Sequence, residues 1–261
     1  MKKQITTLYP LYKSAWLFVY GLILLAQLIS VALHLSRVDT VATWLLAPLL
    51  SVWVWRARGP KLLVLVFVLF WVGDVLGNPR LLGIGPNGLF LSVAAFAAAN
   101  VILLALCLQR NTLIEWQTIL GGHQRWRAGV VVLCLIAVAL GLALAWSSLN
   151  LVLRLATLIY LLLLLFTLTA ALAVDIRAGV GTALLLISHL LVVLEVAGRL
   201  LGTATLFRLP VLALYGFGIL LIAVGVVIAH LPRAQVPGSS LENAPRDDRY
   251  QNFETGDSNV K

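Results

Sequence analysis

Eight apolar runs, separated by short polar links, follow one another along the chain. They cover about residues 14–35, 40–56, 60–77, 88–109, 128–146, 149–172, 179–200 and 209–230. A helix that crosses a bilayer needs roughly 20 mainly apolar residues, within a range of about 17–25. The pattern therefore predicts an all-α fold, a polytopic membrane helix bundle with about eight transmembrane helices in residues 1–230. Because two runs are short and two are almost continuous, seven helices is the alternative count.

The composition also favours a membrane protein. Hydrophobic residues make up 61% of the chain and charged residues only 11%, whereas soluble domains have about 25% charged residues. The net charge is +9, but lysines and arginines stand singly or in small groups between the apolar runs. This distribution is typical of topology signals and differs from a nucleic-acid-binding stripe. We therefore expect an integral, multi-pass protein among membrane lipids, with no nucleic-acid partner.

The same charges predict the orientation of the bundle. With the N-terminus inside, eleven Lys or Arg residues fall in inner segments and four in outer ones. The positive-inside rule then places both termini in the cytoplasm, and we expect a bacterial cytoplasmic membrane. The first run is long for a signal peptide, so we expect it to be retained as a helix. Residues 231–261 are polar and contain Pro, Gly and Ser, which predicts a disordered cytoplasmic tail.

Motifs of soluble enzymes are missing from the chain. It has no phosphate-binding Gly-rich loop, no Cys-x-x-Cys pair, no His-Glu-x-x-His and no Gly-x-Ser-x-Gly elbow. The four histidines are scattered, and Cys107 and Cys134 lie in different apolar runs. The sequence therefore predicts no metal and no cofactor, so polar residues within the apolar runs become the main candidates for chemistry.

Two ionisable residues within the runs are candidates for catalysis. A charged side chain at the centre of a bilayer costs roughly 2.5–3.5 kcal/mol on insertion scales, so such residues tend to be functional. Asp74 is the only carboxylate in the run from Pro60, and either touches interfacial water or lines a cavity as an acid or base. His189 lies near the middle of the seventh run and is either a packed, hydrogen-bonded side chain or a functional one.

Other polar residues at membrane depth are candidates for substrate binding: Asn100, Arg154, Ser188, Glu195 and Tyr215. Each has a structural alternative. Asn100 follows three alanines, as in close helix packing. Arg154 either extends to the interface or holds a lipid phosphate. Glu195 lies four residues before Arg199 and can pair with it on one helix face.

The third and seventh runs cross the membrane in the same direction. Asp74 and Glu195 are therefore expected at similar depth, with His189 deeper. If these two helices touch, a carboxylate and an imidazole face one cavity. Hydropathy does not decide which helices touch.

Five segments follow in an order that is similar to a known family: Ala47–Leu50, Phe70–Leu76, Leu91–Leu103, Gly181–His189, and Leu214-Tyr215 with Gly218. The chain from about residue 40 to 230 resembles the YhhN-like lysoplasmalogenase family of eight-helix membrane proteins. Gly73-Asp74 resembles that family's Gly-Asp motif in the third helix. The fourth segment resembles its Gly-Ala…Ser-Asp motif, and the fifth its Tyr-Tyr-x-x-Gln segment.

The chain departs from the family pattern at five positions, where Ala47 replaces Lys, Asn100 replaces His, Leu103 replaces Tyr, His189 replaces the second Asp, and Gly218 replaces Gln. Of the paired aspartates that the resemblance implies for catalysis, Asp74 is kept. The chain is therefore identified as a divergent member.

The resemblance implies hydrolysis of the vinyl ether bond of a lysoplasmalogen-type lipid, giving a fatty aldehyde and a glycerophospho-alcohol. The substrate is then a lysolipid or another amphiphilic small molecule. Asp74 would stabilise the oxocarbenium-like cation, His189 would carry the proton, and Glu195 would be the reserve acid. The alternative is a non-catalytic protein that binds or transports a lipid or small molecule through Asp74, Arg154 and His189.

Overall fold

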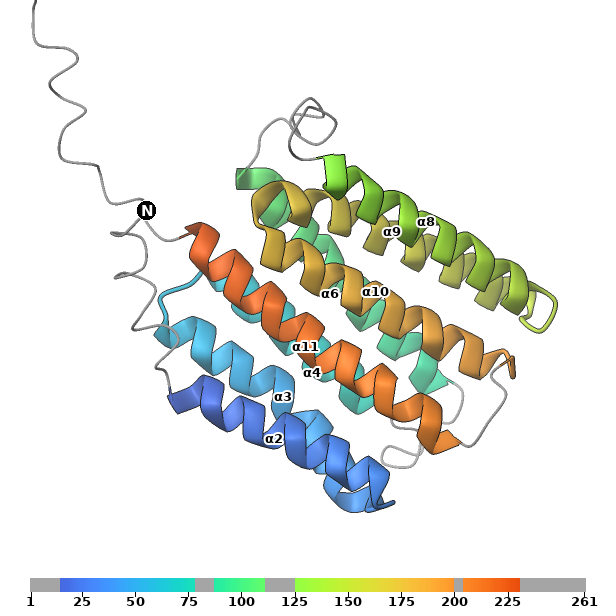
Figure 1. Cartoon of the computed structure of the whole chain (residues 1–261), viewed down its shortest axis with the longest axis horizontal. Coiled ribbons are helices and arrows are strands. Elements are labelled where there is room, and N and C mark those ends of the chain that lie inside the picture. Colours follow the sequence, from blue (N-terminus) through green and yellow to red (C-terminus); the bar gives the residue numbers. More distant parts are fainter. Residues whose placement is uncertain (1–14, 78–86, 111–124, 200–203, 231–261) are drawn as a thin grey trace, which may run out of the picture. The chain divides into compact units, whose positions relative to one another are not determined.

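The computed structural model describes residues 15–77, 87–110, 125–199 and 204–230, and in these residues it contains eight helices and no strand (Figure 1). The helices are α2 (Ala15–Ala32), α3 (Ser36–Arg56), α4 (Lys61–Leu76), α6 (Asn87–Arg110), α8 (Arg125–Trp146), α9 (Leu151–Val174), α10 (Ile176–Val196) and α11 (Ala204–His230). The expectation of an all-α fold is confirmed. The predicted tail, residues 231–261, lies outside the described residues.

Seven of the described helices are long and apolar enough to cross a membrane. The eighth, α4, has 16 residues, which at 1.5 Å per residue cover about 24 Å of a hydrocarbon core of about 30 Å. The protein is therefore a multi-pass membrane protein, and its third apolar run forms a helix shorter than a full span. The orientation of the bundle in the membrane stays a prediction.

Polar residues cap the starts of two helices, and some helices begin or end beyond the predicted apolar runs. Asn150 caps α9 by accepting a hydrogen bond from the Leu153 backbone N–H at 2.8 Å. Asp175, the single residue between α9 and α10, caps α10 by accepting from the Arg177 N–H at 2.7 Å. Both are favoured N-cap residue types. The start of α9 lies within the predicted run 149–172, whereas α10 starts at Ile176, three residues before the predicted run 179–200.

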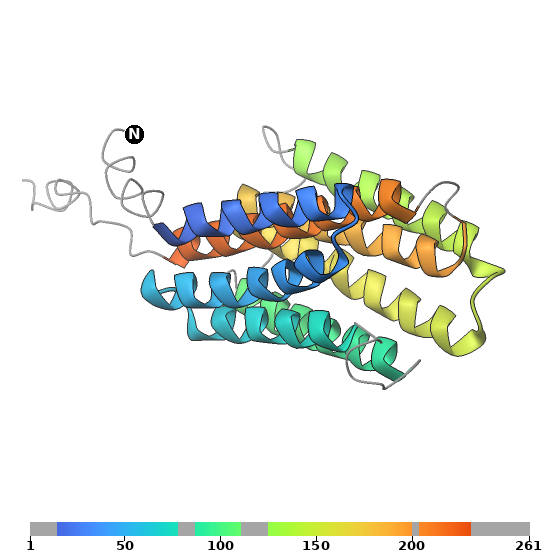
Figure 2. The same cartoon turned by 90° about the horizontal axis from the view of Figure 1, so that it is seen from below.

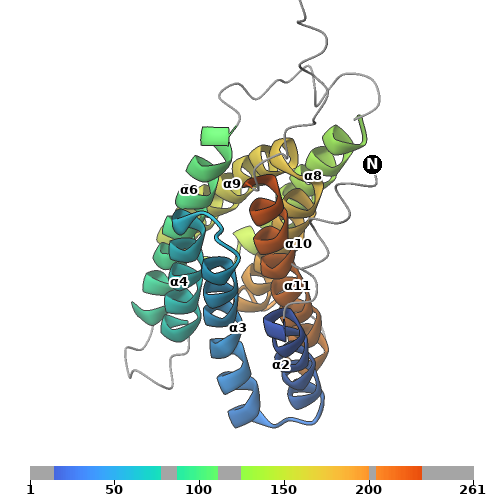
Figure 3. The same cartoon turned by 90° about the vertical axis from the view of Figure 1, so that its left-hand side faces the viewer.

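Neighbouring helices form a closed circuit in the order α2, α3, α4, α6, α9, α10, α11 and back to α2, with α8 packed against α9 and α10 (Figure 3). α11 also contacts α3, so α2, α3 and α11 lie side by side (Figure 2). Large side chains such as Phe67, Phe70 and Leu164 are fully buried. Leu133 and Leu140 of α8 are largely exposed. Such exposed apolar residues suit contact with lipid chains.

The contact between α10 and α11 is the most extensive in the bundle and depends on two facing glycines. A Cβ added at Gly181 would lie 2.5 Å from the Gly218 carbonyl oxygen, and one at Gly218 would lie 2.9 Å from the Gly181 carbonyl oxygen. Small residues let membrane helices approach this closely. Nearer the start of α11, the Ser188 hydroxyl donates to the Val211 carbonyl at 2.8 Å. These contacts fix how α11 sits against α10.

We predict that Gly181→Ala destabilises the protein by about 1–3 kcal/mol, because the new methyl group must push the α11 backbone away. The measurement is unfolding in detergent, followed by circular dichroism. Gly129→Ala in α8 is the control, because a Cβ there meets nothing within 4 Å. Equal stabilities of the two variants would contradict the close packing of α10 on α11.

Candidate functional site

Asp74 is held by a tyrosine from another helix. The Tyr215 hydroxyl on α11 donates a hydrogen bond to Asp74 Oδ2 on α4 at 2.8 Å. Tyr215 is buried, while Asp74 is half-buried. The carboxylate lies two residues before the end of α4 at Leu76. A carboxylate in a hydrocarbon interior requires such a partner.

Gly73 lets an aromatic ring approach α4 beside Asp74. A Cβ at Gly73 would lie 2.8 Å from the Phe96 ring of α6. The Ser92 hydroxyl, one turn before Phe96 on α6, donates to the Gly73 carbonyl oxygen at 2.7 Å. The glycine of the Gly-Asp pair therefore provides the space in which Phe96 packs, and the aspartate provides the polar group.

His189 is surrounded by aromatic rings from three other helices. Its ring centroid lies 5.1 Å from that of Phe96 on α6, 5.4 Å from that of Tyr160 on α9, and 6.3 Å from that of Tyr215 on α11. All three pairs are edge-to-face, an arrangement that aromatic rings prefer. Tyr215 thus contacts both candidate catalytic residues, Asp74 through its hydroxyl and His189 through its ring.

The hydrogen bond of His189 determines which of its nitrogens is free. Nδ1 lies 2.8 Å from the Leu185 carbonyl oxygen, which can only accept a hydrogen bond. Nδ1 must therefore carry a hydrogen, so Nε2 is the nitrogen available to take up or release a proton.

Direct contact between the helices of Asp74 and His189 was considered in the sequence analysis. The structure brings the two residues together in another way. Their helices, α4 and α10, are not among the pairs in extensive contact. Tyr215 and Phe96 instead stand between them and contact His189 directly. The two candidate catalytic residues therefore belong to one aromatic and polar cluster built by α4, α6, α9, α10 and α11.

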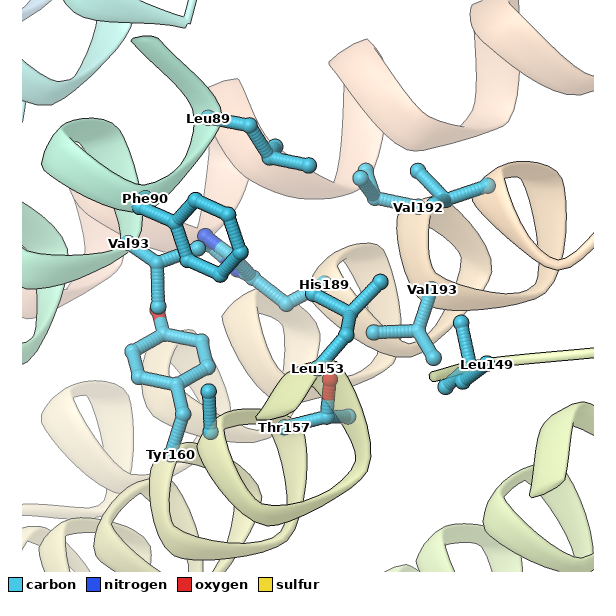
Figure 4. A pocket seen from close by; sticks show the side chains of 12 residues that line it. Leu89, Phe90, Val93, Leu149, Leu153, Thr157, Tyr160, His189, Val192 and Val193 are labelled. Atoms are coloured by element: carbon cyan, nitrogen blue, oxygen red, sulfur yellow. The ribbon is translucent and has the colours of Figure 1, made fainter. Parts of the chain in front are cut away.

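A cavity of about 70 Å³ opens beside His189, between α6, α9 and α10. Figure 4 shows Phe90 and Val93 approaching it from α6, Tyr160 from α9, and His189 and Val193 from α10. Most of its lining is aliphatic or aromatic, and Thr157, Tyr160 and His189 supply the polar groups. His189 therefore lies where the cluster meets an apolar cavity.

The remaining predicted binding residues are distributed over different surroundings. Ser188 joins α10 to α11 and does not line the cavity. Asn100 is fully buried one turn from Phe96, donates to its carbonyl at 2.8 Å, and leaves Oδ1 without a partner in the described residues. Arg154 donates from Nε to the Leu149 carbonyl at 2.7 Å and stacks on a tryptophan ring. Each of these three residues therefore makes a structural contact within the bundle.

Glu195 is exposed near the end of α10. The expected pairing with Arg199 is not found, because the Arg199 guanidinium instead donates to the Ser147 hydroxyl. Arg199 follows the end of α10, where helical i, i+4 spacing no longer holds.

Sequence reasoning missed two polar features of the bundle. Tyr160 contacts His189, and its position in a leucine-rich helix was its only signal. A separate polar group joins α2, α3 and α11: Asp39 Oδ2 pairs with Arg208 at 2.5 Å, and Gln27 donates to Thr43 at 2.6 Å. Charges at helix ends were counted as topology signals, so this ion pair between the exposed Arg208 and the buried Asp39 was not recognised.

A closed circuit of apolar helices around an internal carboxylate, tyrosine and histidine defines a multi-pass membrane protein with a polar site in its interior. The model of the YhhN family matches residues 38–226, more than half of the chain. The chain therefore belongs to the YhhN family, as its motifs predicted. Comparison with curated proteins and with solved structures finds no match.

We predict that Asp74→Ala and Tyr215→Phe are energetically coupled, with a coupling energy between about 0.6 kcal/mol, the mean measured for hydrogen bonds between membrane helices, and about 1.7 kcal/mol, the maximum. The measurement is a double-mutant cycle of unfolding free energies in detergent. Tyr215→Phe with Thr167→Val is the control cycle, since the Thr167 hydroxyl donates to the Leu163 carbonyl within its own helix, α9. That pair should add within about 0.3–0.5 kcal/mol. Additivity in the Asp74 cycle as well would show that the bond contributes nothing.

Proposed function

We propose that this protein is a membrane-embedded hydrolase that cleaves the vinyl ether bond of a lysoplasmalogen-type lipid. The products are a fatty aldehyde and a glycerophospho-alcohol. Asp74 and His189 are the proposed catalytic residues, and Tyr215 positions the carboxylate. Both termini are proposed to face the cytoplasm of a bacterial cell.

The observation that carries the proposal is the position of His189. This residue replaces the second aspartate of the family motif, yet it contacts Tyr215, which holds the retained aspartate. On its other side it lines an apolar cavity between helices. A proton-carrying side chain between a fixed carboxylate and an apolar cavity suits chemistry on an ether bond at the head of a hydrocarbon chain.

Vinyl ether hydrolysis needs one proton donor and one group that stabilises a cation. In the proposed reaction His189 first takes up a proton at Nε2, while Nδ1 keeps its hydrogen bond to the Leu185 carbonyl. The resulting imidazolium delivers this proton from Nε2 to the alkene carbon remote from oxygen, and the π electrons form the new C–H bond. An oxygen lone pair then makes the oxocarbenium-like cation, which the negative charge of Asp74 stabilises. Water adds to the cationic carbon and returns a proton to His189, giving a hemiacetal. The hemiacetal breaks its C–O bond to glycerol, and its hydroxyl proton passes to the glycerol oxygen.

The surroundings of the candidate residues support some of the proposed catalytic and binding roles more than others. Neither Asp74 nor Glu195 lines the cavity. Asp74 is held by Tyr215 in the cluster that contains His189, whereas Glu195 is exposed, so Glu195 is a weak reserve acid. Arg154 is engaged by a backbone carbonyl and a tryptophan ring. These placements favour a mechanism confined to Asp74, Tyr215 and His189.

A second candidate function is lipid binding or transport without hydrolysis. One observation favours it: Ala47 and Leu103, which replace Lys and Tyr of the family pattern, are fully buried apolar side chains. The interior is therefore less polar than the family pattern implies. Ligand binding that persists without any aldehyde release would support this function.

We predict that the purified protein releases a fatty aldehyde from a vinyl ether lysolipid, and that Asp74→Asn and His189→Asn each lower the rate by about 10²–10⁴-fold. Asp74→Asn removes the charge and keeps an acceptor for Tyr215. His189→Asn keeps an N–H for the Leu185 carbonyl and removes Nε2. The measurement is aldehyde release in detergent.

His230→Asn is the matched control for His189→Asn. The Nδ1 of His230 also bonds the carbonyl four residues earlier, at 2.8 Å, but this residue lies at the end of α11 outside the cluster. We expect it to hydrolyse at the wild-type rate. Wild-type hydrolysis by Asp74→Asn or His189→Asn would overturn the assignment of that residue.

A further inference from the structure

Two arginines from different helices are anchored to the link between α8 and α9. Arg154, on α9, donates from Nε to the Leu149 carbonyl at 2.7 Å, and its guanidinium carbon lies 5.3 Å from the centroid of the Trp146 ring. Arg199, just beyond the end of α10, donates to the Ser147 hydroxyl. The Cα atoms of Ser147 and Leu149 are two residues apart, at most about 7 Å. Both guanidinium groups are therefore held at one short stretch of backbone.

A small apolar core fixes the position of this link. Ala145 of α8, Leu149 of the link and Ala197 at the end of α10 are buried against one another, with Leu153 of α9 packed beside them. The end of α8, the start of α9 and the end of α10 thus meet at one end of the bundle (Figure 1). The two arginines are presented from a packed part of the structure.

The two guanidinium groups have no carboxylate partner among the described residues. The ion pair that these residues contain joins Arg208 to Asp39, and Glu195, on the last turn of α10, is exposed and pairs with neither arginine. Each guanidinium carries several N–H donors and uses only one of them in the contacts above. In the predicted orientation this end faces outward, so the two charges do not serve the positive-inside rule. They remain available to an anion from outside the chain.

The surroundings of the arginines place them at the level of lipid head groups. Trp146 is 40% exposed, and tryptophan is enriched where a membrane meets water. Leu144 of α8 and Leu151 of α9 are 60% and 67% exposed, and both suit contact with lipid chains. Guanidinium groups bind phosphate through paired N–H donors. A phospholipid can use the arginines and the leucines together, whereas a free phosphate can use only the arginines.

We infer that Arg154 and Arg199 bind the phosphate of an anionic phospholipid in the leaflet at this end of the bundle, while its acyl chains lie along the exposed leucines of α8 and α9. The inference goes beyond the proposed function and does not rest on it, because it involves no hydrolysis and none of the catalytic residues. A bound lipid of this kind would join α9 to α10 through its phosphate.

The test measures binding of phosphatidylglycerol to the full-length protein in detergent by native mass spectrometry, which gives the Kd of the first bound lipid. Arg154→Gln and Arg199→Gln should each weaken this binding roughly 3- to 10-fold, between the effect of an exposed ion pair and that of a buried charge-assisted hydrogen bond. Arg199 is exposed, and its described contact is with one hydroxyl group. Arg199→Gln is therefore expected to fold, and it tests the inference even if Arg154→Gln does not.

Arg37→Gln is the matched control. It makes the same change at another exposed arginine, at the start of α3 and away from the α8–α9 link. It should keep the wild-type Kd. If Arg37→Gln weakened binding as much as Arg199→Gln, the lipid would be responding to overall charge, and the inference would be overturned. Wild-type affinity in Arg199→Gln, or in a folded Arg154→Gln, would also overturn it.

Two further ligands identify the group that is bound. Diacylglycerol has the acyl chains and no phosphate, and glycerol 3-phosphate has the phosphate and no chains. We expect both to bind much more weakly than phosphatidylglycerol. Diacylglycerol binding of equal affinity would contradict recognition of the phosphate. Displacement of phosphatidylglycerol by an equal concentration of glycerol 3-phosphate would show a site for a free phosphate and would contradict the lipid assignment.

Discussion

A carboxylate within a bundle of apolar helices needs a hydrogen-bond partner from the protein, and much of the interior is arranged around that need. Asp74 obtains its partner from Tyr215, which lies on a different helix. The bond requires α4 and α11 to have a fixed depth and rotation relative to each other. The glycine contact between α10 and α11 and the space that Gly73 leaves for Phe96 supply those constraints from two sides. Changes far from Asp74 can therefore move its partner.

His189 stands where the family pattern has an aspartate, and this substitution changes the charge and the proton chemistry of the site. The imidazole lies among three aromatic rings and is oriented by the Leu185 carbonyl, so one nitrogen is fixed and the other is free. An aspartate at this position would bring a second negative charge near Asp74. A neutral imidazole avoids that repulsion and can take up at Nε2 the proton that it then delivers. Gly218, in place of the family's glutamine, packs backbone to backbone on Gly181 and leaves no room for a long side chain.

The sequence predicted the helices and singled out Asp74 as a polar residue within an apolar run, because both signals are local. Apolar runs mark spans, and a single carboxylate within a run is conspicuous. Hydropathy could not show that α4 and α10 are bridged by Tyr215, since every helix here is apolar on most sides and no stripe marks its neighbours. Tyr160 escaped notice for a related reason: an aromatic side chain in a leucine-rich helix is ordinary until it is found beside His189. Arg199 was paired with Glu195 by spacing, but the helix ends before it.

The most direct test of the central claim, that a proton is delivered to carbon beside Asp74 and His189, is hydrolysis of the vinyl ether lipid in D₂O with mass spectrometry of the aldehyde. The account predicts one deuterium on the carbon next to the aldehyde group, above the exchange seen when the preformed aldehyde is incubated with the protein. It also predicts that this labelled product disappears in Asp74→Asn. Aldehyde without that deuterium, or labelled aldehyde at the wild-type rate from Asp74→Asn, would contradict it.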